Sequence, residues 1–267
     1  FKGQTILSAS SKDKSLKTKL MKVKNKIEIS QIVGEALASK AKKDNIKMVV
    51  LDRNGYPYHG RVRAFADSVR KFYEQEMTPN VEKWNENGIV DRDFWLKAGD
   101  AGIMGGSVGE EFGGSGGDMG FDSVALYEQA RAGDGSWGYG IQSIVIHYIT
   151  AYGSPEQKAN WLPKLVSGEK IGALAMTEPG AGSDVQSIKT SAQKDGNQYT
   201  INGSKIFITN GQSADLVIVT SKTDKDAGAK GVSLIMVDTS KVDGFRRGKN
   251  LKKLGLKGND TSELFFE

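Results

Sequence analysis

Two patterns of hydrophobic and polar positions divide most of the chain. From Ala64 to about Ser167, apolar residues recur at helical spacing, and glycine clusters such as EEFGGSGGDMG interrupt them. After Lys170 the apolar runs are short and alternating, as in QYTINGSKIFITNG and ADLVIVTSK, and Gly, Asn and Asp separate them. The pattern predicts an all-helical domain followed by an antiparallel sheet or β-barrel.

Local signals add detail to these two regions. Ser154, followed by a proline and by Gln157 three positions on, predicts a helix that begins with a capping box. Asn202-Gly203 and Asn210-Gly211 are dipeptides that favour tight turns. We therefore expect a helix start at 154 and a turn at each dipeptide.

The first sixty residues follow a third pattern. QTILSAS at residues 4–10 alternates as a strand does, and residues 28–43 place apolar side chains on one face of a helix. IKMVVLD at residues 46–52 is a short apolar run typical of a covered strand. Strand, helix and strand in this order predict a small α/β unit.

Composition excludes several kinds of site. The 267 residues contain no cysteine, so disulfides and thiolate metal sites are excluded. The two histidines, His59 and His147, are far apart in sequence, so a histidine metal site or a Ser-His-Asp triad is poorly supported. GGSGGDMG and GAGSDV do not satisfy the G-x-G-x-x-G fingerprint of a Rossmann nucleotide site. We expect no metal and no Rossmann domain.

The first residues and the hydropathy of the chain indicate its cellular location. No stretch approaches the run of about 18 apolar residues that a membrane span needs. The start, Phe1-Lys2-Gly3, has no Met and lacks the layout of a signal peptide. We expect a cytoplasmic protein whose chain is cut from something longer.

Charge is distributed unevenly along the chain. Residues 1–71 carry 17 Lys and Arg against 6 Asp and Glu, a net charge of +11. The remaining residues carry 20 basic against 26 acidic side chains, a net charge of −6. The first segment is therefore either a polyanion-binding arm or a lysine-rich solvated surface.

The segment GALAMTEPGAGSDVQSIKT, followed by YTINGSKIFITNG, combines glycine-rich backbone with hydroxyl and apolar side chains. The turn with Gly180 and Gly182 would bring backbone amides close to a ligand. Hydroxyls and apolar cover would come from Thr177, Ser183, Thr209, Leu174, Met176 and Phe207. Such a surface suits a flat heterocycle with a polar edge. The alternative is a barrel rim whose polar residues only satisfy turns.

These motifs, together with FWLKAGDAGIMGGSVGEEFGGSGGD, YGSPEQKANWLPKLVSGEKIGA and FRRGKNLKKLGLKGNDTSELFFE, resemble the acyl-CoA dehydrogenase family over about residues 64–267. The resemblance implies that FAD lies on the β domain, with Thr177 and Thr209 hydrogen-bonded to its isoalloxazine ring. Leu174, Met176 and Phe207 would pack near the ring, and Phe207 indicates a long-chain type. Gly182 and Ser183 would line the cofactor, and also the pantetheine of an acyl-CoA substrate.

The family removes an α proton with a glutamate base and passes a β hydride to the flavin. That glutamate belongs to a C-terminal helical domain, so we expect this chain to end before the base and the four-helix bundle. The resemblance implies α,β-dehydrogenation of a fatty acyl-CoA by homo-oligomeric relatives. For this chain it implies no catalytic residue and no activity on its own.

DRNGYPYHGRVRAFAD gathers arginines with aromatic rings, as contact with unpaired RNA requires. TILSASSKDKSLK and VGEALASKAKKDNIKMVVLDRNGYPYHGRV resemble the bacterial large-subunit ribosomal protein that binds 5S rRNA, over about residues 4–62. This second resemblance implies an RNA-facing set made of Arg53, Tyr58, His59, Arg61 and Arg63. The alternative is an ordinary exposed loop.

The two resemblances meet in residues 61–72, which suit both families. We expect an α+β multidomain chain with an α/β fragment at 1–63, a helical domain at 64–170 and a β-barrel domain at 171–267. Three functions stay open: a truncated flavin dehydrogenase, an rRNA-binding fragment, or a chimera with no function of its own.

Overall fold

The computed structural model describes residues 60–133 and 135–267, and the single positions 16, 21, 32 and 36. The elements predicted within residues 4–52 lie, apart from those positions, outside the described residues. The same holds for Arg53, Tyr58 and His59. The chain divides into two compact units, residues 1–56 and 57–267, and the fold described below is that of the second unit.

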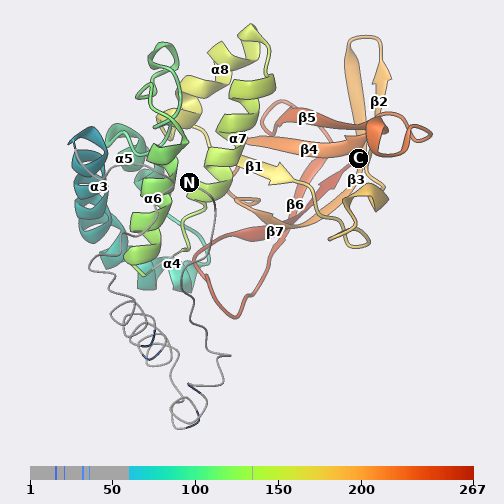
Figure 1. The fold of residues 1–267 in the computed structure, drawn as a ribbon. Helices are drawn as coiled ribbons and strands as arrows, with labels where there is room; N and C mark the ends of the chain where they lie inside the picture. Colours follow the sequence, from blue (N-terminus) through green and yellow to red (C-terminus); the bar gives the residue numbers. More distant parts are fainter. Residues whose placement is uncertain (1–15, 17–20, 22–31, 33–35, 37–59, 134) are drawn as a thin grey trace. The chain divides into compact units, whose positions relative to one another are not determined.

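The first half of this unit is helical, as the periodicity predicts (Figure 1). Its helices are α3 (Gly60–Phe72), α4 (Val81–Asn87), α5 (Arg92–Asp100), α6 (Met119–Arg131), α7 (Tyr139–Tyr152) and α8 (Pro155–Val166). Shorter helical turns are η2 (Tyr73–Met77), η3 (Thr78–Asn80) and η4 (Glu110–Phe112). The capping box at the start of α8 is confirmed: the Gln157 amide donates to Ser154 Oγ at 3.2 Å, and the Ser154 amide donates to the Gln157 side chain at 2.8 Å.

The second half forms one curled seven-stranded sheet beside the helices (Figure 1). Its strands are β1 (Gly172–Ala175), β2 (Ser191–Asp195), β3 (Gln198–Thr209), β4 (Leu216–Lys222), β5 (Val232–Asp238), β6 (Phe245–Asn250) and β7 (Thr261–Phe266), with the turns η5 (Val185–Ser187) and η6 (Gly228–Gly231) between them. The order is β1-β4-β2-β3-β7-β6, and β5 also pairs with β4. Most pairs are antiparallel, as expected, whereas β1 and β2 each pair with β4 in parallel.

The turn predicted at Asn202-Gly203 is wrong. Both residues lie inside β3, and the hairpin between β2 and β3 turns at Gly196-Asn197 instead. A Cβ on Gly203 would lie 2.4 Å from the hydroxyl oxygen of Thr190, so this glycine serves a close approach inside the sheet. Asn210-Gly211 does form a turn, as predicted.

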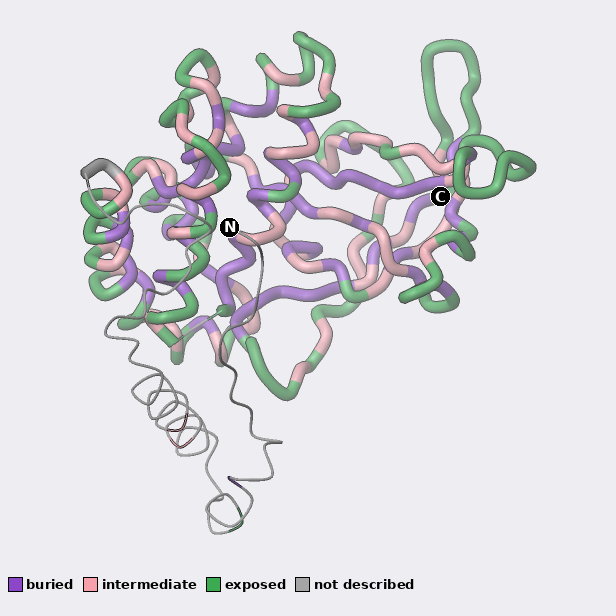
Figure 2. The backbone as a smooth tube through the Cα atoms, in the orientation of Figure 1, coloured by how far each residue is buried: buried purple, intermediate pink, exposed green. Residues whose placement is uncertain are grey.

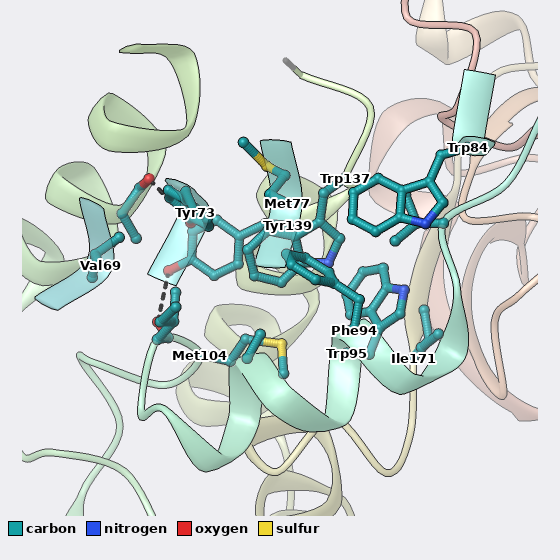
Figure 3. Packing of buried hydrophobic residues seen from close by; sticks show 14 residues of the cluster. Val69, Tyr73, Met77, Trp84, Phe94, Trp95, Met104, Trp137, Tyr139 and Ile171 are labelled. Carbon is teal, nitrogen blue, oxygen red and sulfur yellow. Dashed lines mark hydrogen bonds between the residues drawn. The ribbon is translucent and has the colours of Figure 1, made fainter. Parts of the chain in front are cut away.

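Aromatic rings packed around Trp137 fill the helical domain (Figure 3). The Trp137 ring centre lies 5.1 Å from Phe94 and 5.4 Å from Trp95, both nearly edge-on, and 5.0 Å from Tyr139, on which it stacks. Aromatic pairs in these geometries add about 0.5–1.5 kcal/mol each beyond the burial of their surface. Trp137 therefore joins the loop before α7 to α5.

The two faces of the sheet have different partners. On β4, Leu216 and Ile218 pack with residues of α7 and α8. Val217 and Val219, which alternate with them, pack with Ile208 of β3 inside the β domain. Figure 2 shows the resulting buried strands beside the helices, and the exposed tip of the β2–β3 hairpin away from them. Helices α7 and α8 thus pack against one face of the sheet at β1, β4 and β5.

Replacement of Trp137 by alanine is expected to lower the free energy of unfolding by about 3–5 kcal/mol, because it leaves a cavity at the centre of the cluster. Tyr152→Ala is the control: Tyr152 is 80% exposed, so its change should stay within about 0.5 kcal/mol. Urea titrations followed by circular dichroism compare the two variants. A Trp137 variant as stable as the control would contradict this account of the core.

Candidate functional site

The candidate site, called here the strip, lies along the end of β1 and the C-terminal half of β3. It holds the cofactor residues predicted from the sequence: Leu174, Met176, Thr177, Gly182, Ser183, Phe207 and Thr209. The amide of Ile206 donates to the carbonyl of Thr177 at 2.9 Å. This bond brings Thr177 beside the segment that carries Phe207, although thirty positions of sequence separate them.

Strand alternation places the strip on one side of its strands. Ala173 and Ala175 of β1 and Ile208 of β3 are buried together in the core of the β domain. Side chains next to them point the other way. The side chains that lie away from this core are therefore Leu174, Met176, Phe207 and Thr209.

A β-bulge presents Phe207 to solvent. The register between β3 and β7 shifts between Lys205 and Ile208, and Phe207 lies within this irregularity. Phe207 has a φ of 60° and is 63% exposed. A left-handed backbone costs a residue with a Cβ about 1–2 kcal/mol, and little burial offsets that cost here. Strain of this kind clusters at functional sites, so the φ of Phe207 makes the strip a candidate functional site.

Two residues with hydroxyl groups lie close to the Phe207 segment: Thr177, whose carbonyl accepts the Ile206 amide, and Thr209, two positions after Phe207. Thr177 and Thr209 are both half-buried. No protein group in residues 60–133 and 135–267 hydrogen-bonds either hydroxyl. A half-buried hydroxyl without a protein partner is available to a ligand. The strip therefore combines an exposed aromatic ring with two available hydrogen-bonding groups.

The glycines of the turn after β1 leave open space. Glu178 and Ala181 exchange backbone hydrogen bonds of 3.0 and 3.1 Å, which close this turn. A Cβ on Gly180 or Gly182 would meet no heavy atom within 4 Å, and neither glycine has a positive φ. By contrast, a Cβ on Gly172 would lie 2.7 Å from a side chain of α7. Packing requires glycine at 172, whereas glycine at 180 and 182 keeps the approach to the turn clear.

A buried ion pair lies beneath this turn. Lys205 Nζ donates to Glu178 Oε1 at 2.9 Å, and the two side chains are 0% and 6% exposed. Burial lowers the pKa of Lys205, with Glu178 opposing the shift. Burial alone would raise the pKa of Glu178, but hydrogen bonds from Thr190, Lys189 and Lys205 together lower it. The hydrogen bonds to Glu178 therefore offset the effect of its burial, and Glu178 opposes the effect of burial on Lys205.

Asn210 fixes the end of the strip next to Thr209. Its side-chain amide donates to the carbonyl of Gly138 at 3.1 Å and to that of Gly172 at 3.0 Å. Asn210 itself has a φ of 63° and is buried. The last residues of β3 are therefore held against β1 and against the residue that precedes α7.

Sequence reasoning missed Glu178, Lys205 and Asn210. One signal for Lys205 was present: Ile201, Gly203 and Lys205 share one phase of the β3 alternation, so the lysine falls on the phase of a buried residue. A charged residue at such a position needs a buried partner. Glu178, the acidic residue in TEPG, is the buried partner that such reasoning would have proposed.

The other predicted residues and hollows lie away from the strip. Arg61 belongs to α3, as does Arg63, which is exposed and lies 3.8 Å from Asp67. Two hollows among the described residues lie beside α8 and between α4 and α5. Within that part of the chain, no cluster of His, Asp or Glu could hold a metal ion, and no helix is long and apolar enough to cross a bilayer.

Two family models match the second unit in order. They are the N-terminal domain of acyl-CoA dehydrogenase over residues 61–169 and the middle domain of acyl-CoA dehydrogenase over residues 173–267. Residues 61–267 thus belong to the acyl-CoA dehydrogenase family. A third model, ribosomal L18 of archaea, bacteria, mitochondria and chloroplasts, matches residues 1–73. Both resemblances stated from the sequence are confirmed.

Relatives and solved structures agree with this assignment. The long-chain specific acyl-CoA dehydrogenase of Sus scrofa is 46% identical over 206 residues, which are 76% of this chain and 48% of that protein. The acyl-CoA dehydrogenase structure from Geobacillus kaustophilus has a TM-score of 0.74 at 44% identity, over 79% of this chain and 56% of that one. A glutaryl-CoA dehydrogenase from Mycobacterium smegmatis, in complex with FADH2, has a TM-score of 0.70 at 32% identity, over 77% and 52%. The chain spans about half the length of the curated relatives it matches.

Phe207→Asn is expected to stabilise the ligand-free chain by about 1 kcal/mol, because asparagine tolerates a positive φ and little burial is lost. Tyr199→Asn is the matched control, since Tyr199 is an exposed aromatic residue of the same strand without a positive φ. Urea midpoints of both variants decide the matter. Equal or opposite shifts would show that Phe207 is not strained.

Proposed function

We propose that residues 64–267 form the flavin-binding part of an FAD-dependent acyl-CoA dehydrogenase that acts on a fatty acyl-CoA. The proposed domains are a helical one at 64–170 and a β one at 171–267. The observation that carries the proposal is Phe207, which is exposed at a strained bulge beside the free hydroxyls of Thr177 and Thr209. Membership of the family supports it.

The chemistry of the strip fits an isoalloxazine ring. This ring is flat and apolar on its faces and carries hydrogen-bonding atoms on its edge. Phe207 and Met176 would cover a face, and the hydroxyls of Thr177 and Thr209 would meet the edge. The open space at Gly180 and Gly182 would let a ligand approach the backbone of the turn closely.

The proposed role of this chain is to bind and orient. When bound, FAD supplies the acceptor for a hydride from the β carbon of the thioester. Leu174, which packs against the cluster of α7 and α8, would lie near the ring, and Gly182 and Ser183 would line the cofactor and the pantetheine of acyl-CoA. The bulge fixes the backbone that carries Phe207, and a fixed backbone lowers the entropy cost of binding. We assign no residue here to proton removal from the α carbon.

Finer features of the proposed enzyme rest on its relatives. A long-chain acyl substrate is supported by the 46% identity to the Sus scrofa protein. The resemblance implies homo-oligomers for the full-length dehydrogenase relatives. A cytoplasmic location stays a prediction from the sequence, and the mammalian long-chain relatives are named as mitochondrial proteins.

Purified protein mixed with FAD and then washed should keep a red-shifted flavin absorbance band. Thr177→Ala should lower the flavin occupancy several-fold, because a hydrogen bond to the ring edge is lost. Thr200→Ala, an exposed threonine of β3 outside the strip, is the control and should keep full occupancy. Equal occupancy in all three proteins would place the flavin elsewhere, and no retained band would contradict flavin binding.

A second function is favoured by the match of residues 1–73 to ribosomal L18 and by the net charge of +11 on residues 1–71. We infer that residues 1–63 contact 5S rRNA. The proposed RNA-facing residues are Arg53, Tyr58, His59, Arg61 and Arg63. If neither FAD nor RNA binds, the third alternative, a chimera without a function of its own, stands.

Arg61→Ala combined with Arg63→Ala should weaken 5S rRNA binding and flatten its salt dependence, because two cations no longer displace counterions from phosphates. Lys249→Ala with Lys252→Ala, two exposed cations of the β domain, is the charge-matched control. Gel shifts at several salt concentrations provide the slopes. An unchanged affinity and slope in the arginine variant would exclude these two residues from the interface.

A further inference from the structure

We propose that the buried Lys205–Glu178 pair is the positioning device of the strip: it sets where Thr177 and the bulge at Phe207 lie relative to each other. The inference rests on the proposed function, and it concerns residues that contact no cofactor. Glu178 directly follows Thr177, and Lys205 lies two positions before Phe207. One ion pair thus joins the two segments from which the strip is made.

Lys205 connects three segments of the β domain. Its ammonium group donates to the carbonyl of Met176 at 3.0 Å, to Glu178 Oε1 at 2.9 Å and to the carbonyl of Thr220 at 2.6 Å. These three acceptors use all three of its protons. The end of β1, the turn after it and β4 are therefore held at fixed distances from β3.

Glu178 holds the other side of the turn. Besides Lys205, it accepts the amides of Lys189 at 2.6 Å and Thr190 at 3.0 Å. The turn that carries Gly180 and Gly182 is thus fixed both to β3 and to the segment before β2. No other titratable group takes part in these bonds.

A contribution to the stability of the fold does not by itself explain why this position holds a buried ion pair. Taking two charges out of water costs about as much as their attraction returns, and apolar residues of similar volume are often equally stabilising at such sites. An ion pair is directional, whereas an apolar contact is not, because hydrogen-bonded charges fix which atoms lie next to each other. Its place between the two halves of the strip indicates that this directional control is what the pair contributes.

The test replaces both charges by apolar residues of similar size, as Lys205→Met with Glu178→Met in the full 267-residue chain. Hydrogen exchange of the ligand-free proteins is followed by mass spectrometry in peptides that cover residues 176–183 and 203–209. The dissociation constant for FAD is then measured by fluorescence. Arg70→Met with Glu128→Met is the matched control, since it removes a 2.8 Å pair whose carboxylate is 1% exposed, in the helical domain.

We expect the double variant to fold, with amides of the strip exchanging at least tenfold faster and those of β5 unchanged. The dissociation constant for FAD should rise on the order of tenfold or more, as loss of precise placement does at binding sites. The control should change neither quantity. The same two readouts of Lys205→Met alone should move in the same direction.

Three results are informative. Faster exchange in the strip with weaker FAD binding supports the proposal. Unchanged exchange and affinity, with only a lower urea midpoint, would overturn it and leave the pair a merely stabilising role. If the unsubstituted chain retains no FAD, the proposed function fails, and the exchange rates of the ligand-free proteins still decide whether the pair positions the strip.

Discussion

The arrangement of the second unit depends on the hydrogen bonds of one buried side chain, Asn210. Its amide group reaches the carbonyls of Gly138, just before α7, and of Gly172, at the start of β1. Its backbone amide donates to the carbonyl of Asp260, which precedes β7. A buried carbonyl left without a donor costs about 1–3 kcal/mol, so these segments are held where Asn210 can reach them. A Cβ on Gly138 would lie 1.9 Å from the Asn210 side chain, which leaves room only for glycine.

Local pattern was enough to predict the elements whose chemistry is local. The helices of residues 64–167, the capping box at Ser154 and the turn at Asn210-Gly211 depend on neighbours within about four residues, and all were predicted. The turn predicted at Asn202-Gly203 was wrong, because glycine is needed at 203 for a different reason: Thr190 lies too close to this point of β3 for a side chain. The parallel pairing of β1 with β4 depends on segments far apart in sequence, and alternation carries no information about it.

Some features of the candidate site could also be predicted from local sequence, and others could not. Its contact residues could be proposed because hydroxyl, apolar and glycine residues gather in two short motifs. The positive φ of Phe207 could not, because it arises from a shift in the pairing of β3 with β7. The Lys205–Glu178 pair needed the knowledge that these two motifs lie side by side. Sequence thus proposed the residues of the strip, and the structure shows the bulge and the buried ion pair that lie next to them.

Helix α3 explains how two families can overlap over residues 61–73. Its buried side chains, Ala66 and Val69, are followed at the same helical spacing by Tyr73. Arg70 on its flank donates to Glu128 of α6 at 2.8 Å. An amphipathic helix needs only an apolar stripe and a polar back, and this sequence supplies both. One helix can therefore satisfy the pattern of either family without a linker between them.

The sheet topology has a consequence for how the β domain folds. Among the described strands, the pairs β2–β3, β4–β5 and β6–β7 are neighbours in both sequence and space, and a longer loop joins the last pair. β1 can pair only after β4 has been synthesised, and Gly203 of β3 can pair with Phe266 only after β7 has been synthesised. Pairings between distant segments slow folding, since the entropy of closing each loop is lost before any contact forms. During synthesis the aromatic core around Trp137 can therefore form on the ribosome well before β3 gains its second partner and the bulge at Phe207 exists.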